Sequence, residues 1–292
     1  MKLGISTKCF GGKSVAECAK TVRGFGYGAV ELCLCQNDAE YRQYNTVGGA
    51  KCPTEAEFLG ICRVYREQGL DISALGLYPN LWCGSSYAKR MARIDFCRFL
   101  DLADMADIRT VSTEIGFSVA ARPIRGAAII GRTYSHEDEL RVREAFAFAA
   151  LEAMKRGITL SIEPSEFDPV FRNGAEGYLE FIDEIEDVSG AEGVLGLTVS
   201  PFRFCFGKIG SDADEKNYDP ELVGKLKKRA RLIHLKERED GERYFCCPRG
   251  IYGGWREFLS DFSDVPYASV EYADDRTAGR TLDYIKSQIT QK

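Results

Sequence analysis

Two glutamates and one histidine are the residues whose types and spacing suggest chemistry in this chain. Glu163 ends the run TLSIE, His234 lies in LIHLKE and Glu271 ends ASVE. Each run is short and rich in apolar or β-branched residues, which is typical of a buried strand. Two carboxylates and an imidazole form a mixed oxygen and nitrogen ligand set, which suits Mn, Mg, Co or Fe better than a set of thiolates does.

Each of these residues also has a simpler interpretation. A glutamate at the end of a strand can bind a loop amide or a substrate hydroxyl, and a histidine in a strand is often a buried polar residue with an ordinary partner. The joint occurrence of all three at strand ends favours a shared site.

Short apolar runs alternate with amphipathic runs along the whole chain. We expect strands at residues 3–6, 29–34, 71–77, 110–114, 159–163, 194–199, 232–235 and 268–271. Helical patterns lie between them at residues 14–25, 54–65, 87–106, 135–156, 178–185, 220–228, 255–262 and 282–289. Eight strand–helix pairs predict parallel strands with right-handed crossovers, closed into a single (β/α)8 TIM barrel over residues 1–292. In such a barrel the carboxyl ends of the strands share one mouth, where the active site is expected.

The composition excludes several classes of protein. The formal net charge is −5, which disfavours a nucleic-acid-binding protein with a basic face. No apolar run approaches the roughly 18 residues of a membrane span, and the opening MKLGISTKCF has no secretory pattern. Eleven scattered cysteines without zinc-site spacing indicate thiols in a reducing compartment, so we expect a cytoplasmic protein.

Several longer stretches resemble the sugar phosphate isomerase/epimerase family of xylose isomerase-like TIM barrels. They are REAFAFAALEAMKRGITLSIEP, RLIHLKE, PRGIYGGW and the opening LGISTKCFGG. The resemblance covers essentially the whole chain, although each motif is short. It implies one divalent metal ion (Mn, Co, Mg, Zn or Fe), held in the family by Glu, Asp, His and Glu on strands five to eight. Glu163, His234 and Glu271 match three of these ligands.

Strand six departs from the family pattern. The chain has Ser200-Pro201-Phe202-Arg203 where the family has an aspartate ligand, and a neutral hydroxyl is a poor ligand for a hard cation. Glu237, three residues after His234, or Glu114, at the end of strand four, could supply the missing carboxylate. Alternatively, Arg203 could replace the charge of the ion, or the site could be degenerate. We expect strand six to weaken the metal site.

The resemblance implies a sugar or sugar-phosphate isomerase or epimerase, or a related lyase. Glu163 and Glu271 would transfer protons next to a carbonyl, and Lys236 would act as an electrophile or anchor the substrate. Tyr78 and Trp255 would stack on the sugar, although core packing explains them equally well.

The alternative function is a non-catalytic subunit of the same fold that binds a carbohydrate or a partner and has lost its metal. The expected partner is a small-molecule sugar or sugar phosphate, with neither nucleic acid nor membrane. The sequence leaves a homo-oligomer open.

Overall fold

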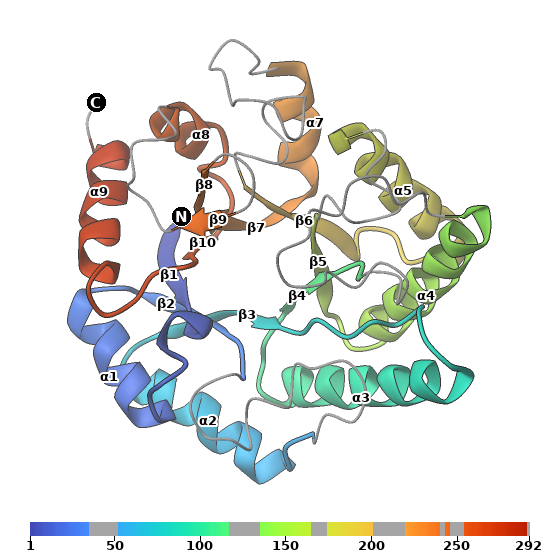
Figure 1. Cartoon of the computed structure of the whole chain (residues 1–292), viewed down its shortest axis with the longest axis horizontal. Coiled ribbons are helices and arrows are strands. Elements are labelled where there is room, and N and C mark those ends of the chain that lie inside the picture. Colours follow the sequence, from blue (N-terminus) through green and yellow to red (C-terminus); the bar gives the residue numbers. More distant parts are fainter. Residues whose placement is uncertain are drawn as a thin grey trace.

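The chain folds as a (β/α)8 barrel, in which a closed ring of parallel strands is surrounded by helices (Figure 1). This computed structural model describes residues 1–34, 52–116, 135–164, 174–200, 220–239, 243–245 and 254–290. The strands of the ring are β1 (Lys2–Ser6), β2 (Ala29–Leu32), β3 (Asp71–Gly76), β4 (Thr110–Glu114), β5 (Thr159–Glu163), β6 (Leu195–Val199), β7 (Ala230–Leu235) and β10 (Tyr267–Val270). Strands β1 and β10 pair in parallel and close the ring.

The helices form the outer layer and cover the barrel on all sides in Figure 1. They are α1 (Val15–Phe25), α2 (Glu55–Glu67), α3 (Ser86–Met105), α4 (His136–Met154), α5 (Gly174–Ser189), α7 (Pro220–Arg229), α8 (Trp255–Asp261) and α9 (Ala278–Thr290). Their apolar faces and the strands share one hydrophobic core. Within the described residues, no helix is long and apolar enough to cross a membrane.

Local sequence explains where several helices begin. Ser14, Thr54 and Ser135 each cap a helix through the backbone amide three residues later, and the acidic side chain at that position bonds back to the cap. These reciprocal bonds satisfy amide groups that the first helical turn leaves without a partner. The helix starts predicted at residues 54 and 135 are therefore confirmed.

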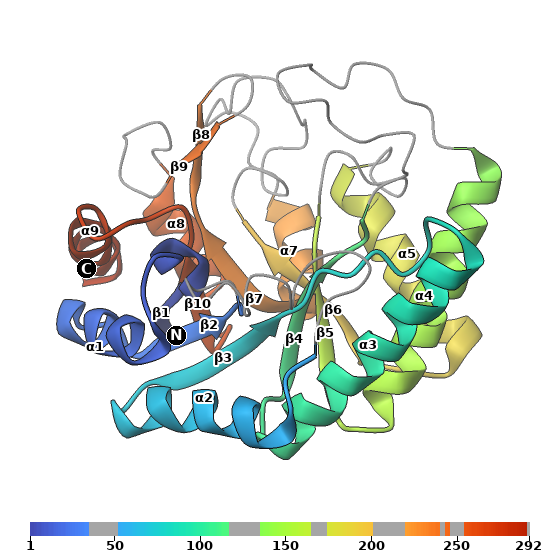
Figure 2. The ribbon, with the colours of Figure 1, turned by 60° about the horizontal axis from the view of Figure 1, so that its bottom comes forward.

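The predicted barrel and the order of its eight strand–helix pairs are confirmed, and two further elements appear. A 3-10 helix, η1 (Thr7–Phe10), follows β1, and an antiparallel hairpin is formed by β8 (Glu237–Glu239) and β9 (Arg243–Phe245). The hairpin continues from β7 beyond the barrel (Figure 2). Each of its strands has only three residues, too few for the periodicity that revealed the barrel strands.

Small hydroxyl side chains lie inside the barrel, below its mouth. The Ser161 hydroxyl lies 2.7 Å from that of Thr198, and the Ser112 hydroxyl lies 3.5 Å from the same atom. Ser269 is also buried and pairs in register with His234. We call these four residues the hydroxyl layer.

Candidate active site

Five charged side chains gather at the carboxyl ends of the strands, and we call them the mouth cluster. Its members come from β2, β5, the β7 end and the residue after β10: Glu31, Glu163, His234, Lys236 and Glu271. All five are buried, with exposures of at most 6%. Because parallel strands end at one mouth, residues far apart in the sequence meet there.

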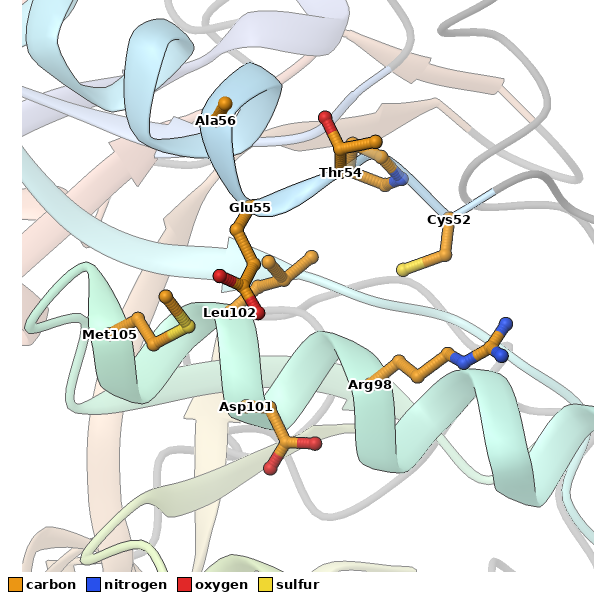
Figure 3. Close-up of a pocket in the computed structure, with 9 residues that line it drawn as sticks. Cys52, Thr54, Glu55, Ala56, Arg98, Asp101, Leu102 and Met105 are labelled. Atoms are coloured by element: carbon orange, nitrogen blue, oxygen red, sulfur yellow. The ribbon is translucent and has the colours of Figure 1, made fainter.

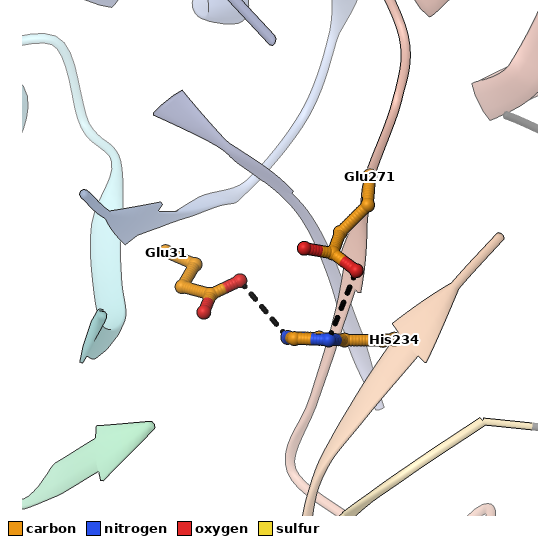
Figure 4. A group of neighbouring side chains, drawn as sticks. All are labelled: Glu31, His234 and Glu271. Atoms are coloured by element: carbon orange, nitrogen blue, oxygen red, sulfur yellow. Dashed lines mark hydrogen bonds and ion pairs between the residues drawn. The ribbon is translucent and has the colours of Figure 1, made fainter. Parts of the chain in front are cut away.

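His234 is the centre of the mouth cluster, and its two ring nitrogens face different partners. Its Nε2 lies 3.1 Å from Glu31 Oε2 (Figure 4). Its Nδ1 lies 3.2 Å from Glu163 Oε1 and 3.1 Å from Glu271 Oε2. Among the described residues, however, Nδ1 makes no hydrogen bond of acceptable direction. The contacts of Nδ1 are therefore electrostatic, and this buried nitrogen lacks an in-line partner.

Lys236 joins the same two glutamates. Its Nζ donates to Glu163 Oε1 and, at 2.7 Å, to Glu271 Oε2. Residues 234 and 236 are separated by one residue at the end of β7, so both side chains face the barrel axis. The ammonium compensates two carboxylates that are almost completely removed from water.

A second cation and a phenol border the mouth cluster on the β2 side. Tyr78, just after β3, donates its hydroxyl to Glu31 Oε1 at 3.1 Å. Lys8 Nζ, from η1, lies 3.8 Å from the centre of the Tyr78 ring. One face of this ring is thus already covered by a cation.

The charges of the mouth cluster shift the pKa values of its members. Burial lowers the pKa of His234, but the charges of Glu271, Glu31 and Glu163 outweigh it and raise that pKa well above its usual value. Burial raises the pKa of Glu271, but His234 and Lys236 lower it to about 2. These shifts favour a charged Glu271 carboxylate and a protonated His234 imidazole.

The pKa values of the bordering residues follow the same balance. Burial raises the pKa of Glu31, but the charge of His234 brings it below its usual value. Desolvation, followed by the charge of Glu31, raises the pKa of Tyr78, which keeps the phenol a neutral donor. Lys8 keeps contact with solvent; desolvation lowers its pKa, but the nearby acidic groups, Cys33 first, raise it.

Backbone strain lies next to the cluster. Tyr272, directly after Glu271, has φ 57°, which is uncommon for a residue with a side chain. Its ring centre lies 5.8 Å from Lys236 Nζ. Strain of this kind is found where a functional geometry is enforced, and here it turns the chain immediately after a cluster glutamate.

The structure brings together four of the residues predicted for the site: Glu163, His234, Lys236 and Glu271. Their roles as catalytic or metal-binding residues stay predictions. Glu114 ends β4, is half-buried and pairs in register with Glu163, so the two side chains share a face.

The remaining predicted residues differ in what the structure shows of them. Trp255 begins α8, is fully buried and packs edge-on against Phe258 at 6.1 Å, a core position. Glu237 begins β8, and its side chain is outside the description. Arg203 lies outside the described residues. Ser200 directly follows β6 and is buried.

Sequence reasoning missed Glu31 and Lys8. Glu31 lies in the strand AVEL, where it was interpreted only as part of an apolar run. The available signal was an acidic residue near the carboxyl end of a strand that is buried on both faces, since such residues rarely lie inside without a partner. Lys8 carried no such signal, because the 3-10 helix that places it has no periodicity.

Glu31, His234 and Glu271 form a possible metal-binding triad, with one ligand atom of each within 4.8 Å of the others. The two nitrogens of an imidazole point away from each other, so one ion can use only one of them. Because Nδ1 faces two glutamates, the ligand set that fits one ion best is Nδ1 with Glu163 and Glu271. Glu31 then holds the ring through Nε2, as carboxylates do behind metal-bound histidines.

A groove of about 580 Å³ lies elsewhere, on the outside of the barrel between the start of α2 and α3 (Figure 3). Its lining includes Cys52, Glu55, Arg98 and Met105. Asp101, also in its wall, pairs with Arg156. The groove lacks the converging buried charges of the mouth cluster, so we place the candidate active site at the barrel mouth.

Comparisons with known proteins agree with this architecture. Residues 19–288 match the family model described as a xylose isomerase-like TIM barrel. None of the curated protein sequences matches the chain.

Several solved structures are similar to the chain over nearly its full length. One is the 3-keto-D-glucoside 4-epimerase YcjR from E. coli, with a TM-score of 0.70, 10% identity and coverage of 98% of this chain and 99% of that chain. Another is a D-psicose 3-epimerase in the presence of D-fructose, with a TM-score of 0.64, 14% identity and full coverage of both chains, 100% and 100%. A third is a xylose isomerase-like TIM barrel protein from Mycobacterium smegmatis in complex with magnesium, with a TM-score of 0.67, 13% identity and coverage of 99% and 96%. At these identities the likeness shows the fold alone.

Proposed function

Because the chain belongs to the xylose isomerase-like TIM barrel family, we propose that it is a sugar or sugar-phosphate isomerase or epimerase, or a related lyase, in which Glu163 and Glu271 transfer protons next to a carbonyl. One observation supports this most: both glutamates contact the same two groups, His234 Nδ1 and Lys236 Nζ. Two carboxylates that contact the same two nitrogen atoms are close enough to reach one small substrate. The sugar epimerases among the similar structures support the same substrate class.

The chemistry follows from what each side chain can do. A carbon beside a carbonyl loses a proton to a carboxylate, and the electron pair moves onto the carbonyl oxygen to give an enediolate. One glutamate removes the proton and the other returns one, with each positioned for general acid–base catalysis, which typically contributes about 10²–10⁴-fold. Lys236 donates toward the developing negative charge on oxygen. Glu31 keeps the His234 ring in place.

A divalent cation fits the donor set of this mouth. Glu163, His234 Nδ1 and Glu271 would hold it, and the buried nitrogen without an in-line partner is the atom that such a cation would use. When bound, the cation would stabilise the negative charge on the substrate oxygen. Mn, Co, Mg, Zn and Fe all accept these ligands, and the magnesium complex among the similar structures supports the choice of a divalent ion.

The roles of the surrounding residues are part of the proposal. Glu114, beside Glu163 in register, would bind a substrate hydroxyl. Tyr78 would do so through its phenol oxygen, since Lys8 covers one face of its ring. A small sugar as the partner and a cytoplasmic location complete the proposal.

The test is hydrogen exchange. The whole protein, with Mn²⁺ added, is incubated in heavy water with ketohexoses, inososes and ketose phosphates, and NMR follows the loss of C–H signals beside the carbonyl. We expect exchange with at least one class, and its loss in Glu163→Gln and Glu271→Gln. Glu144→Gln is the matched control, because Glu144 is an exposed residue of α4 that forms an ion pair with Arg93, away from the barrel mouth. Sugar binding without exchange in any class would favour the non-catalytic carbohydrate-binding subunit instead.

A further inference from the structure

Two carboxylate oxygens at the barrel mouth each contact both His234 and Lys236. Glu163 Oε1 contacts both His234 Nδ1 and Lys236 Nζ, and so does Glu271 Oε2. An ion bound to Nδ1 would need these same two oxygens. The Lys236 ammonium already donates to both of them, so a divalent ion and this ammonium would compete for the same two oxygens.

Burial of the Lys236 side chain opposes its displacement from the two glutamates. It is 2% exposed, against 8% and 6% for the side chains of its two partners. The ring of Tyr272 lies 5.8 Å from its Nζ. An ammonium displaced from these partners must be rehydrated or paired elsewhere, and in a buried mouth this opposes its replacement.

The charge balance favours the ammonium as well. Strand β6 supplies the buried hydroxyl of Ser200, which adds no negative charge. Lys236 adds a fixed positive charge between the two glutamates that a divalent ion would use. A divalent ion at Nδ1 would lie next to this ammonium, at a separation where the repulsion between like charges is strong.

We propose that the Lys236 ammonium is a built-in cation that competes with a divalent metal ion for Glu163 and Glu271. The chain therefore binds such an ion much more weakly than its Glu–His–Glu ligand set would on its own, and the metal-free mouth stays ordered. This inference deepens the proposed function, since it concerns the same site, but it is tested by binding rather than by turnover.

The experiment measures Mn²⁺ affinity of the whole, chelator-treated protein, by calorimetry and by the electron paramagnetic resonance signal of free Mn²⁺. The variant is Lys236→Met, which keeps an unbranched side chain, only one atom shorter, and removes its charge. We expect Mn²⁺ affinity to rise by about tenfold or more relative to the natural chain. Lys236→Arg keeps the charge and should bind Mn²⁺ as weakly as the natural chain does. Lys225→Met is the surface control, since Lys225 lies on α7 and is half-exposed, and it should leave the affinity unchanged.

If Lys236→Met is unstable, its unfolding temperature with and without Mn²⁺ provides a second measure of metal binding. In chelator, Lys236→Met should unfold at a lower temperature than the natural chain, and Mn²⁺ should restore it, because a ligand that binds only the folded state stabilises that state. Mn²⁺ affinity of Lys236→Met equal to or below that of the natural chain would overturn the proposal. This outcome does not depend on whether any sugar reacts, so it is distinct from failure of the proposed function.

Discussion

The inside of the barrel has two layers that follow different rules. At the mouth lie charged residues, and two positions earlier on the same strands lie hydroxyls: Ser112 below Glu114, Ser161 below Glu163, Thr198 below Ser200 and Ser269 below Glu271. Strand geometry explains the pairing, because residues i and i+2 share a face. The ring of His234 lies in register with Ser269, where small neighbours leave space for it.

The difference between the layers shows how this barrel places charge. In the hydroxyl layer each polar group is neutral. Ser161 and Thr198 lie within hydrogen-bond distance of each other at 2.7 Å, and Ser112 lies 3.5 Å from Thr198, whereas the buried Ser269 hydroxyl has no hydrogen-bond partner among the described residues. At the mouth, charges are tolerated because each one faces an opposite charge from another strand. Strand β6 is the exception: its mouth residue, Ser200, is as neutral as the layer below it.

The largest expected effect comes from breaking the mouth cluster at its centre. His234→Leu leaves Glu31, Glu163 and Glu271 with one buried cation fewer, and loss of one partner in a buried ion cluster costs about 3–5 kcal/mol. Urea unfolding of the metal-free protein measures this loss. A loss no greater than that of a surface substitution such as Glu144→Gln would mean that the mouth charges are not energetically coupled.

The pH dependence of stability sharpens the same contrast. The lowered pKa of Glu271, about 2, gives a contribution that is present above its unfolded value of about 4.3 and is lost as the pH falls toward 2. The raised pKa of His234 gives a contribution that is present below its unfolded value of about 6.5 and is lost as the pH rises through the folded value.

Metal-free stability contributed by the cluster should therefore be greatest between about pH 4.5 and 6.5. Urea unfolding in chelator from pH 3 to pH 9 checks this, with His234→Leu expected to flatten the alkaline side. An alkaline side of the same slope in the natural chain and in His234→Leu would contradict the assignment. Ser161→Ala, in the hydroxyl layer, should lower the curve without changing its shape.

A single added methyl group should disturb the mouth from below. A Cβ at Gly76, the last residue of β3, would lie 2.3 Å from Cys33 Sγ and 3.2 Å from the Tyr78 ring. Gly76→Ala must move both, and overpacking of this kind costs about 1–3 kcal/mol. Gly24→Ala is the matched control, since nothing lies within 4 Å of its Cβ position. Thermal unfolding measures the stability of both variants. Equal unfolding temperatures would show that the side chains at the mouth repack around the added methyl group without cost.

The smallest effect is expected in the hydroxyl layer. Ser161→Ala removes one neutral hydrogen bond to Thr198, which is worth about 1 kcal/mol. Urea unfolding should show this modest loss, without the pH dependence seen at the mouth. A loss as large as that of His234→Leu would remove the distinction between the layers.

The fold could be predicted from the sequence because periodicity reports burial. β5 was predicted with its observed bounds, and β4 begins at Thr110 and ends at Glu114, as predicted. The β8–β9 hairpin was not predicted because each of its strands is only three residues long.

The site was predictable only where a residue type stood out at a strand end. Glu163, His234 and Glu271 did so, whereas Glu31 was hidden in an apolar run. The contact of Lys236 with both glutamates could not be derived from spacing, because it depends on three strands that meet only in the closed barrel. The sequence of strand six led to the prediction that Arg203 could replace the charge of the metal ion. In the described structure, the cation between Glu163 and Glu271 is Lys236.

The central claim is that Glu163 and Glu271 act as a pair on one substrate, and a double-mutant cycle on hydrogen exchange tests it most directly. The exchange rate in heavy water is measured for the natural chain, Glu163→Gln, Glu271→Gln and the double variant, on the sugar that exchanges fastest. The account predicts that each single variant slows exchange by about 100-fold or more and that the double variant is hardly slower than either, since residues acting as a unit are not additive. Exchange that persists at the natural rate in either single variant would contradict it.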